Sequence, residues 1–462
     1  MTRLALAGAH HRETLEHLFP GDGLEAAAVL LCARISQRSN DLIVREVRPV
    51  PYELCRRQRD SVSWPSDFLD GSISHANREG MSVILAHSHP EGCWGFSVFD
   101  DESDQEIVPD LYDELEDRSA LVGTAIFLKT GAARARLYDR DCIPSDVDMV
   151  RIAGDDISFF FPHRPRIRPM AFGSGMRAEL GALSGAVVGA SGTGSIVAEQ
   201  MARLGFGRIS LIDPDQIELK NLNRIVNATV ADAEASRHKT DRLAEAIRSY
   251  RHDAHVASYP TSIDAPDALF AAAHADVLFC CVDSAVGRQI CDLIASSFVI
   301  PLFDVGVTIP TIETGTSVKI ADVVGRVDYI QPGGSSLADR GVYTQQMLRA
   351  DLLKEIDPGA YKAELSEGYI DGIHEEAPSV ISLNMRAAST AVNEFVARTY
   401  PYRHGDNRDC ARVEFSLADM SEEYWSEDNW SPRLTRHLLG QGGKRPLLGI
   451  PALNAEHWRG RP

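Results

Sequence analysis

The sequence predicts an α/β protein in which a mixed α/β domain is followed by a doubly wound, Rossmann-like and mostly parallel sheet domain. Its 462 residues exceed what one ordinary core needs, so two to four domains are expected. From residue 181 onward, short apolar runs alternate with amphipathic stretches at the spacing of strand–helix units. The proline- and arginine-rich stretch 159–175 resists regular structure and separates the two patterns.

Composition excludes several classes of protein. The net charge of -19 argues against a nucleic-acid partner, because phosphates need a basic surface. No apolar run reaches the roughly 18 residues of a membrane span, and the first residues do not resemble a signal peptide. The eight cysteines are scattered and none forms a CxxC pair, which argues against dense disulfides or a four-cysteine zinc site. We therefore expect no nucleic-acid or membrane partner and a cytoplasmic location.

The first domain is assigned to residues 1–150. Apolar runs at 24–32 and 42–50 read as strands or a helix-to-strand unit, and 82–86 and 121–129 read as further buried strands. Residues 151–180 are expected to form a linker.

A candidate metal centre follows the apolar run 82–86. His87 and His89 are two apart, so in an extended chain they point the same way and can bind one ion. Seven residues separate His89 from Ser97, and two separate Ser97 from Asp100, which we expect to return from an acidic loop as third ligand. Two imidazoles and a carboxylate with one open position form a catalytic zinc arrangement. The alternative is that both histidines are ordinary loop residues.

This spacing resembles the JAMM/MPN (JAB) metallopeptidase family, whose pattern is HxH, seven residues, Ser, two residues, Asp. The resemblance covers about residues 20–145 and implies zinc held by His87, His89 and Asp100. Ser97 would donate a hydrogen bond to the developing oxyanion. The family's general acid/base is a glutamate before the first strand, which matches Glu25, although alanine and cysteine stand where the family usually has glycines. Glu46 is the alternative.

The second domain, residues 181–400, shows repeated strand–helix units. Strands are predicted at 186–190, 208–213, 276–283 and 299–306, and helices at 195–205, 236–250, 287–297 and 382–400. Residues 401–462 are an extension of unknown structure, in which Trp425 and Trp430 are expected to pack on the sheet rather than to dock a peptide.

A candidate nucleotide site opens this domain. Gly189, Gly192 and Gly194 follow the first strand, where glycines let the backbone approach phosphate at a helix N-terminus. Asp213 ends the next strand, the place of an acidic residue that binds ribose hydroxyls. A glycine-rich turn alone is weak evidence, so the residues that follow carry the prediction: Asp215, Glu218, Asn221, Leu222, Arg224, Lys239 and Asp283.

Together with Ser195, this set resembles the ThiF/MoeB superfamily, the adenylating core of ubiquitin-activating enzymes. The resemblance covers about residues 165–400 and implies ATP and Mg²⁺ rather than NAD. In that family Asp213 would hold the ribose, Asp283 would bind magnesium, and Asn221, Arg224 and Lys239 would contact the phosphates. Taken singly, Asn221–Arg224 could be a polar turn, Lys239 a solvated charge and Asp283 a helix N-cap.

The resemblance also implies a homodimer, because the family delivers an arginine from the neighbouring subunit. Arg166 and Arg168, just upstream of the first strand, are the candidates, and a basic linker is the alternative. For an acceptor thiol, Cys410 lies between Arg408 and Arg412, which could lower its pKa, whereas Cys280, Cys281 and Cys291 are expected to be buried. No cysteine lies between Cys291 and Cys410, so the adenylate may instead pass to another protein's thiol or to sulfide.

Both resemblances imply one partner: a ubiquitin-like or sulfur-carrier protein with a C-terminal glycine. The first domain would trim or deconjugate it and the second would adenylate it, possibly with a conjugating-enzyme homologue. Fusions of these families resemble components of prokaryotic ubiquitin-like systems, including antiphage systems. The alternatives are thiocarboxylate formation for biosynthesis and a non-catalytic scaffold that binds a ubiquitin-like protein.

Overall fold

The computed structural model describes the chain except for residues 37–38, 165–167, 315–316, 367–379 and 454–462. Its internal contacts divide the chain into two compact units. Unit 1 comprises Met1–Arg168, joined by Ser296–Val299 and Leu438–His457, and unit 2 comprises Pro169–Ala295 and Ile300–His437.

Unit 1 is built on a nine-stranded mixed sheet in the order β11-β10-β1-β3-β2-β6-β7-β8-β9. Its strands are β1 (Arg3–Ala7), β2 (Ala27–Arg34), β3 (Leu42–Pro49), β6 (Ser82–Ser88), β7 (Val122–Phe127), β8 (Ala133–Tyr138), β9 (Pro144–Asp146), β10 (Met149–Ala153) and β11 (Ile157–Phe160). The helices of this unit are α1 (Gly8–Leu18), α2 (Asp67–Glu79) and α3 (Val98–Glu114). A separate two-stranded ribbon pairs β4 (Arg56–Arg57) with β5 (Val62–Ser63).

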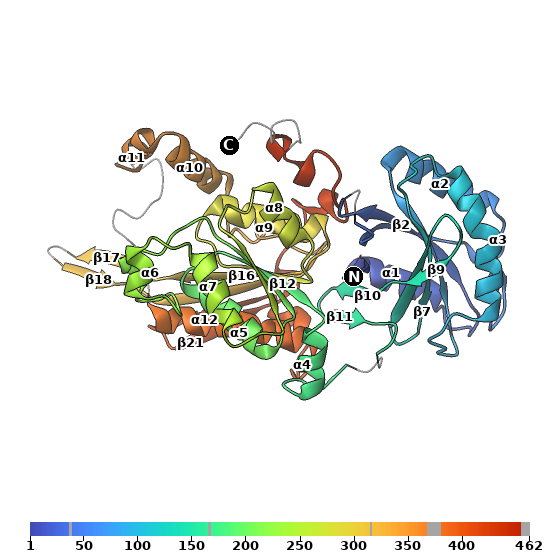
Figure 1. The fold of residues 1–462 in the computed structure, drawn as a ribbon, viewed down its shortest axis with the longest axis horizontal. Helices are drawn as coiled ribbons and strands as arrows, with labels where there is room; N and C mark the ends of the chain where they lie inside the picture. Colours follow the sequence, from blue (N-terminus) through green and yellow to red (C-terminus); the bar gives the residue numbers. More distant parts are fainter. Residues whose placement is uncertain (37–38, 165–167, 315–316, 367–379, 454–462) are drawn as a thin grey trace. The chain divides into compact units, whose positions relative to one another are not determined.

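Helices cover both faces of this sheet, with α1 on one side and α2 and α3 together on the other (Figure 1). The central strand β2 shows why the sheet is apolar on both faces. Leu30 and Cys32 join the core beneath α1, whereas Val29 and Leu31 join the core beneath α2 and α3. Successive side chains of a strand point to opposite faces, so a two-sided core requires the unbroken apolar run seen in the sequence.

Unit 2 is built on an eight-stranded sheet in the order β14-β13-β12-β15-β16-β19-β20-β21. The first five strands are parallel and the last three add in antiparallel fashion. Their bounds are β12 (Ser184–Val188), β13 (Arg208–Ile212), β14 (His255–Tyr259), β15 (Val277–Cys280), β16 (Leu302–Thr308), β19 (Val324–Ile330), β20 (Arg412–Ser416) and β21 (Ser421–Trp425). A small hairpin pairs β17 (Thr311–Thr314) with β18 (Ser317–Ile320).

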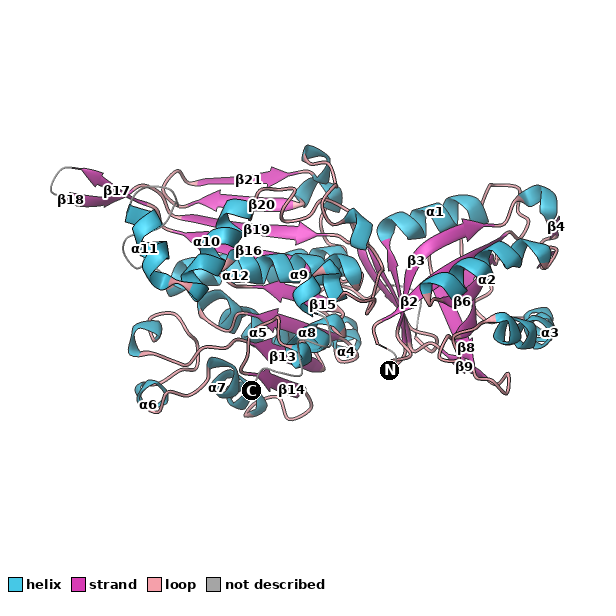
Figure 2. Ribbon diagram, turned by 90° about the horizontal axis from the view of Figure 1, so that it is seen from above, coloured by secondary structure: helices cyan, strands magenta, loops and turns pink. Residues whose placement is uncertain are grey.

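The helices of unit 2 lie on both faces of its sheet, as in a doubly wound fold. Figure 1 shows α8 and α9 on one side and α5, α7 and α12 on the other, and Figure 2 shows the strands side by side. The helix bounds are α4 (Ser174–Leu180), α5 (Gly192–Leu204), α6 (Val230–Glu234), α7 (Lys239–Arg248), α8 (Pro266–Ala273), α9 (Ala285–Ser297), α10 (Gln345–Ile356), α11 (Pro358–Ser366) and α12 (Ile381–Thr399).

The strand order reverses between β12 and β15, because β12 connects forward to β13 while β15 returns to its other side. At such a switch point the loops after the two strands diverge and leave a crevice for a ligand at their carboxyl ends. The glycine turn after β12 and Asp283 after β15 both lie there.

Three sequence expectations need correction. Asp100 lies in the first turn of α3, not in a loop, and the acidic stretch that follows it is helical. Strands β10 and β11 occupy residues 149–153 and 157–160 of the first sheet, and helix α4 occupies 174–180, so the expected linker 151–180 is shorter at both ends. The expected extension 401–462 is divided: β20 and β21 complete the second sheet, and the described residues from Leu438 onward belong to unit 1.

Trp425 and Trp430 stack on each other, with ring centroids 6.0 Å apart, and Arg340 lies 4.6 Å over the Trp430 ring. Trp430 thus packs on the sheet domain as expected, whereas Trp425 is 36% exposed. Among the residues that the structure describes, no helix has the length and apolarity needed to cross a membrane.

Candidate metal centre and nucleotide site

Three predicted metal ligands converge in unit 1. His87 and His89 lie at and just beyond the end of β6, and Asp100 lies in the first turn of α3. The two imidazole Nε2 atoms are 3.0 Å apart, and they lie 3.0 and 3.5 Å from the Asp100 carboxylate oxygens. All three donor atoms are within 4.8 Å of one another.

This donor set fits a zinc ion. Ligand atoms about 2.0–2.1 Å from a tetrahedral ion lie about 3.3 Å apart, close to the separations observed here. His89 also makes a hydrogen bond at its other ring nitrogen, since Nδ1 lies 2.9 Å from the Cys93 carbonyl oxygen. A carbonyl only accepts, so Nδ1 carries the proton and Nε2 is left with its lone pair toward the donor set.

The side chains of the donor set shift one another's pKa values. Burial lowers the pKa of His89, but the hydrogen bonds that its ring donates to the Asp100 carboxylate and the Cys93 carbonyl outweigh this and raise the pKa to about 9. Burial raises the pKa of Asp100, but the two histidines outweigh it and hold the pKa well below its usual range.

Ser97 holds Asp100 in place. It is the N-cap of α3, and its Oγ accepts a hydrogen bond from the Asp100 backbone N–H at 3.1 Å. The Asp100 carboxylate accepts in return from the Ser97 backbone N–H at 2.5 Å. This capping box fixes the ligand against the helix and leaves the Ser97 hydroxyl proton available to a substrate oxygen.

Glu25 stands beside the donor set, just before β2. The adjoining backbone pairs Ala27 with His87, and Ser88 Oγ accepts from the Ala26 N–H at 2.9 Å. Burial raises the pKa of Glu25 to about 8, His89 opposes the rise and Asp100 adds to it. The dependence on both ligands places this carboxyl within their field, as a general acid/base requires.

Glu46, the alternative acid/base, lies on β3 and is engaged elsewhere. Its carboxylate pairs with Arg48 at 2.7 Å and with His75 at 3.2 Å. Geometry therefore favours Glu25.

Sequence reasoning missed an ion-pair network behind the metal centre. Asp104 lies in the stretch expected to be an acidic loop, yet it is buried and accepts hydrogen bonds from Arg136 at 2.6 Å, Thr124 at 2.8 Å and Tyr138 at 2.5 Å. The partners lie at least 20 residues away, so only a helical spacing of Asp104, Val108 and Leu111 could have indicated a buried face.

In unit 2, glycines bring the turn after β12 against neighbouring backbone. Gly189 has a φ of 90°, and a Cβ there would lie 2.6 Å from the Cys281 carbonyl oxygen. A Cβ on Gly194 would overlap the Gly189 carbonyl oxygen, and one on Gly192 would overlap the Asn384 amide. Ser195 follows inside α5, where its Oγ accepts from the Val226 N–H at 3.3 Å. The turn is thus packed closely enough to require glycine at three places.

Acidic and basic side chains meet at the ends of β13 and α7. Asp213 Oδ2 accepts from the Ala190 N–H at 2.6 Å, and Oδ1 accepts from the Asp215 N–H at 2.8 Å. Lys239 opens α7 as predicted and is buried, with its Nζ 2.7 Å from Asp215 and 3.8 Å from Asp213. Burial raises the pKa of Asp213, while Lys239 opposes the rise. Lys239 is therefore not a solvated helix charge.

The stretch Glu218–Arg224 forms a structured turn. Asn221 is buried, and its side-chain oxygen accepts from the Glu218 N–H at 3.2 Å. The Arg224 side chain lies near Gly192, since a Cβ on that glycine would be 3.2 Å from Arg224 Cδ. Asn384 of α12, which the sequence did not single out, meets the same glycine and so joins this site.

Asp283 is exposed in the loop between β15 and α9. It is not the N-cap of α9, because Ser284 Oγ accepts from the Gly287 N–H at 3.1 Å and Asp351 of α10 accepts from the Ala285 N–H at 2.6 Å. The N-cap alternative is therefore wrong, and the role of Asp283 as a magnesium ligand stays a prediction.

The predictions for the cysteines agree with the structure only in part, and one of the two candidate arginines is described. Cys280, Cys281 and Cys291 are buried, as predicted. The expected lowering of the Cys410 pKa is wrong: burial raises it, and Arg408 and Arg412 pair with Asp428 and Asp328 instead. Arg168 contacts Ser158 at 2.5 Å, and Arg166 lies outside the described residues.

Comparison with known proteins gives two domain matches. The model of the ThiF family matches residues 164–396, and the model of prokaryotic homologues of the JAB domain matches residues 8–137.

Two relatives carry the name ubiquitin-like modifier-activating enzyme 5. The one from Bombyx mori is 26% identical over 162 residues, covering 33% of this chain and 38% of the relative. The one from Xenopus laevis is 42% identical over 57 residues, covering 12% of this chain and 14% of the relative. The chain thus spans well under half the length of these relatives.

Among solved structures, E. coli MccB with ATP is similar with a TM-score of 0.42 and 16% identity, over 55% of this chain and 66% of that one. The two units, the switch-point site and the family matches lead to one conclusion. The chain belongs to the ThiF family and carries an N-terminal JAB domain.

Proposed function

We propose that this chain acts twice on the C-terminus of a ubiquitin-like or sulfur-carrier protein in a prokaryotic conjugation system. Unit 2 adenylates the terminal glycine carboxylate with ATP and Mg²⁺, and unit 1 is a zinc-dependent peptidase that exposes that glycine or releases conjugates. The proposal depends above all on the convergence of His87, His89 and Asp100 into one donor set beside Glu25. The ThiF domain supplies the adenylating half.

In unit 1, His87, His89 and Asp100 would hold the zinc ion. A bound zinc ion supplies Lewis-acid polarisation of a carbonyl and lowers the pKa of a bound water toward neutrality. The Glu25 carboxylate would accept a proton from the attacking water and pass it to the leaving nitrogen. The Ser97 hydroxyl would donate to the oxygen of the scissile carbonyl as charge develops on it.

In unit 2, the glycine turn at 189–194 and the N-terminus of α5 would receive the phosphates of ATP. Arg224 and Lys239 would offset their charge, and the Asp213 carboxylate would accept hydrogen bonds from the ribose hydroxyls once it is released from backbone contacts. Asp283 would hold magnesium. The glycine carboxylate attacks the α-phosphorus, pyrophosphate leaves and an acyl-adenylate forms.

The peptidase half is tested with ubiquitin-like proteins that carry a short extension after a terminal glycine. Mass spectrometry should show zinc-dependent removal of the extension. Glu25→Gln should retain zinc but lose at least about a hundredfold in kcat, the usual contribution of a general acid/base. The exposed His252→Ala, in unit 2, serves as the matched control. Cleavage unaffected by both His87→Ala and chelation would overturn this half.

The adenylating half is tested by ATP–pyrophosphate exchange that depends on the ubiquitin-like protein. Asp283→Asn should abolish exchange while leaving zinc content and cleavage unchanged. Exchange that persists in this variant, or that needs no protein partner, would contradict the assigned site.

A second candidate is direct transfer of the activated carboxylate to sulfide, which gives a thiocarboxylate. It is favoured by the absence of cysteine from positions 292–409 and by the raised pKa of Cys410. Incubation with ATP, carrier and sulfide should then give a thiocarboxylate by mass spectrometry in Cys410→Ser as in the parent. A thioester on Cys410 would instead show that the activated carboxylate passes to this cysteine.

A further inference from the structure

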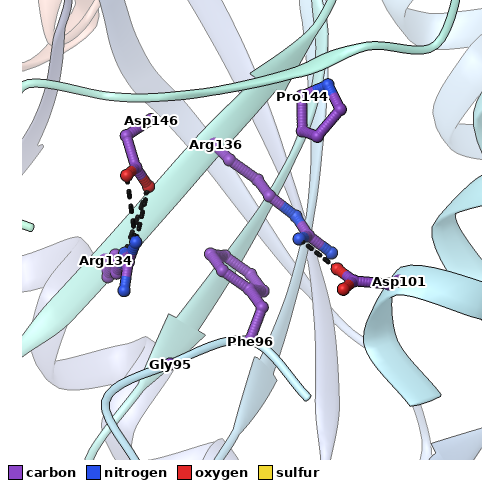
Figure 3. A pocket seen from close by; sticks show the side chains of 7 residues that line it. All are labelled: Gly95, Phe96, Asp101, Arg134, Arg136, Pro144 and Asp146. Carbon is purple, nitrogen blue, oxygen red and sulfur yellow. Dashed lines mark hydrogen bonds and ion pairs between the residues drawn. The ribbon is translucent and has the colours of Figure 1, made fainter. Parts of the chain in front are cut away.

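A cavity of about 320 Å³ opens beside the metal centre of unit 1. It is lined by Gly95, Phe96, Asp101, Arg134, Arg136, Pro144 and Asp146. Figure 3 shows the Phe96 ring between two ion pairs, Arg134 with Asp146 and Arg136 with Asp101. This volume is at the lower end for a ligand site and suits one side chain better than a larger molecule.

The cavity and the metal centre share one segment of chain. Phe96 precedes Ser97, the N-cap of α3, and Asp101 follows the ligand Asp100 in the same helical turn. Arg134 reaches this segment from β8, with its guanidinium 3.4 Å from the Trp94 carbonyl oxygen. A substrate with its scissile bond at the metal therefore has a neighbouring side chain within reach of the cavity.

The charges in the cavity are arranged with carboxylates outward. In the Arg136–Asp101 pair the arginine side chain is 8% exposed and the aspartate 54%. In the Arg134–Asp146 pair the corresponding values are 19% and 28%. In both pairs the arginine is more buried than the aspartate. A ligand entering from solvent therefore meets carboxylate oxygens before guanidinium groups.

The arginines are also committed to other partners. Arg136 donates to the buried Asp104 at 2.6 Å and lies 3.9 Å over the Phe96 ring. Arg134 donates to both Asp146 oxygens, at 2.9 and 3.0 Å. The lining itself holds two carboxylates and two guanidiniums, and the buried Asp104 shares Arg136 and adds a third carboxylate. The exposed His163 also reaches Asp146, at 3.6 Å. The carboxylates therefore outnumber the guanidiniums by one, an excess of negative charge that an anionic ligand would not relieve.

We propose that this cavity is a specificity pocket for a cationic side chain, lysine or arginine, that adjoins the scissile bond of the peptidase substrate. Asp101 and Asp146 accept hydrogen bonds from its ammonium or guanidinium, and Phe96 packs against its methylene groups. The inference rests on the proposed peptidase function and names the class of substrate that unit 1 takes.

The test uses the full chain loaded with zinc and a set of fluorogenic glycine-containing peptides. In each peptide one of the two residues that flank the scissile bond is varied. It is lysine, arginine, norleucine or glutamate. We expect kcat/KM for lysine or arginine at one flanking position to exceed that for glutamate by about tenfold or more, and that for norleucine by a smaller factor.

Variants then assign the preference to the cavity. Asp101→Asn and Asp146→Asn should raise KM for the preferred cationic peptide by about fivefold to tenfold, with kcat and the norleucine peptide little changed. Asp110→Asn is the matched control, because Asp110 is exposed on the same helix but does not line the cavity. Zinc content and thermal midpoint are measured for each variant.

The outcomes separate the inference from the function on which it rests. If no peptide is cleaved in a zinc-dependent manner, the proposed peptidase function is wrong. If peptides are cleaved but the flanking charge has no effect, or glutamate is preferred, the cationic pocket is wrong and the peptidase stands. The preference of the unaltered chain decides this even if a variant fails to fold.

Discussion

At the scale of single residues, Ser97 combines a structural contact with a chemical one. Its oxygen accepts from the Asp100 N–H as the cap of α3, while its proton remains available for a substrate oxygen. Replacing it with alanine removes both, and the loss of a cap costs about 1 kcal/mol of stability. The lost cap changes stability, whereas the lost hydroxyl proton changes kcat, so the two contributions can be measured separately.

We predict that Ser97→Ala lowers kcat of the peptidase by about tenfold to a hundredfold, with a small change in KM, because the lost hydrogen bond forms only as the oxyanion develops. Ser97→Thr keeps both the cap and the hydroxyl and should retain most of the activity. Steady-state kinetics and zinc content on both variants check this. Equal losses in the two variants would show that packing, not the hydroxyl, matters here.

Gly194 tests the nucleotide turn. Because a Cβ would overlap the Gly189 carbonyl oxygen, Gly194→Ala must open the turn that receives the phosphates. We expect ATP affinity to fall by about tenfold or more, which corresponds to about 1.4 kcal/mol. Calorimetric titration with a non-hydrolysable ATP analogue measures it. Gly405→Ala, with open space around its Cβ position, is the control and should bind as the parent does.

At the scale of elements, the sequence predicted the buried strands of both sheets well. Short apolar runs such as 186–188 and 277–280 are typical of strands buried on both faces of a sheet, because side chains on both faces need cover. The ligand spacing of the metal centre and the residues of the nucleotide turn were also readable, since they depend on local spacing along the chain.

Helix α3 was missed because its buried face is not apolar throughout. Asp104 occupies that face together with Val108 and Leu111, and it is tolerated there by Arg136, Thr124 and Tyr138 from strands β7 and β8. Such compensation is set by the tertiary fold and cannot be read from periodicity. The same holds for Asp351, whose role at the start of α9 depends on a helix 65 residues further along.

Asp292 of α9 predicts a pH dependence of stability. Burial raises its pKa to about 7, and its carboxyl accepts from the Tyr343 hydroxyl at 2.9 Å. Since the folded state keeps the proton to higher pH than the unfolded state, the stability this group contributes is full below about pH 4 and is lost as pH rises toward 7.

We expect Asp292→Asn to flatten this dependence. Between pH 5 and 8 the parent should lose roughly 2–3 kcal/mol that the variant keeps, from about two units at 1.36 kcal/mol each. The difference is measured by unfolding the chain in urea at each pH and monitoring unit 2 through the release of a bound fluorescent nucleotide. Asp267→Asn, at an exposed site on α8, should leave the parent's pH dependence intact. An unchanged slope in Asp292→Asn would contradict the assignment.

At the scale of the whole molecule, the described residues after Leu438 are ordered although no sequence pattern predicts their structure. The segment after Leu438 belongs to unit 1: the Gly443 N–H donates to the Arg34 carbonyl oxygen at 2.8 Å, and Lys444 pairs with Glu79 at 2.5 Å. Lys444 and Glu79 are 365 residues apart in the sequence. The segment Gly440–Lys444 is polar and glycine-rich, so nothing local distinguishes a packed strap from a free tail.

The strap, defined here as the described residues after Leu438, is held in unit 1 by buried leucines. One of them, Leu447, is fully buried. We therefore predict that Leu447→Ala, although more than 300 residues from the metal ligands in sequence, destabilises unit 1 by about 2–5 kcal/mol, the range for a buried leucine truncated to alanine. Zinc should be released at a lower urea concentration, while the urea midpoint for nucleotide release from unit 2 should shift less. The control Leu434→Ala removes a side chain that is 57% exposed and should shift neither midpoint. Because each unit is followed by its own ligand, the comparison does not assume that the chain unfolds in one step. Equal shifts of both midpoints in Leu447→Ala would instead mean that the strap stabilises the chain as one cooperative body.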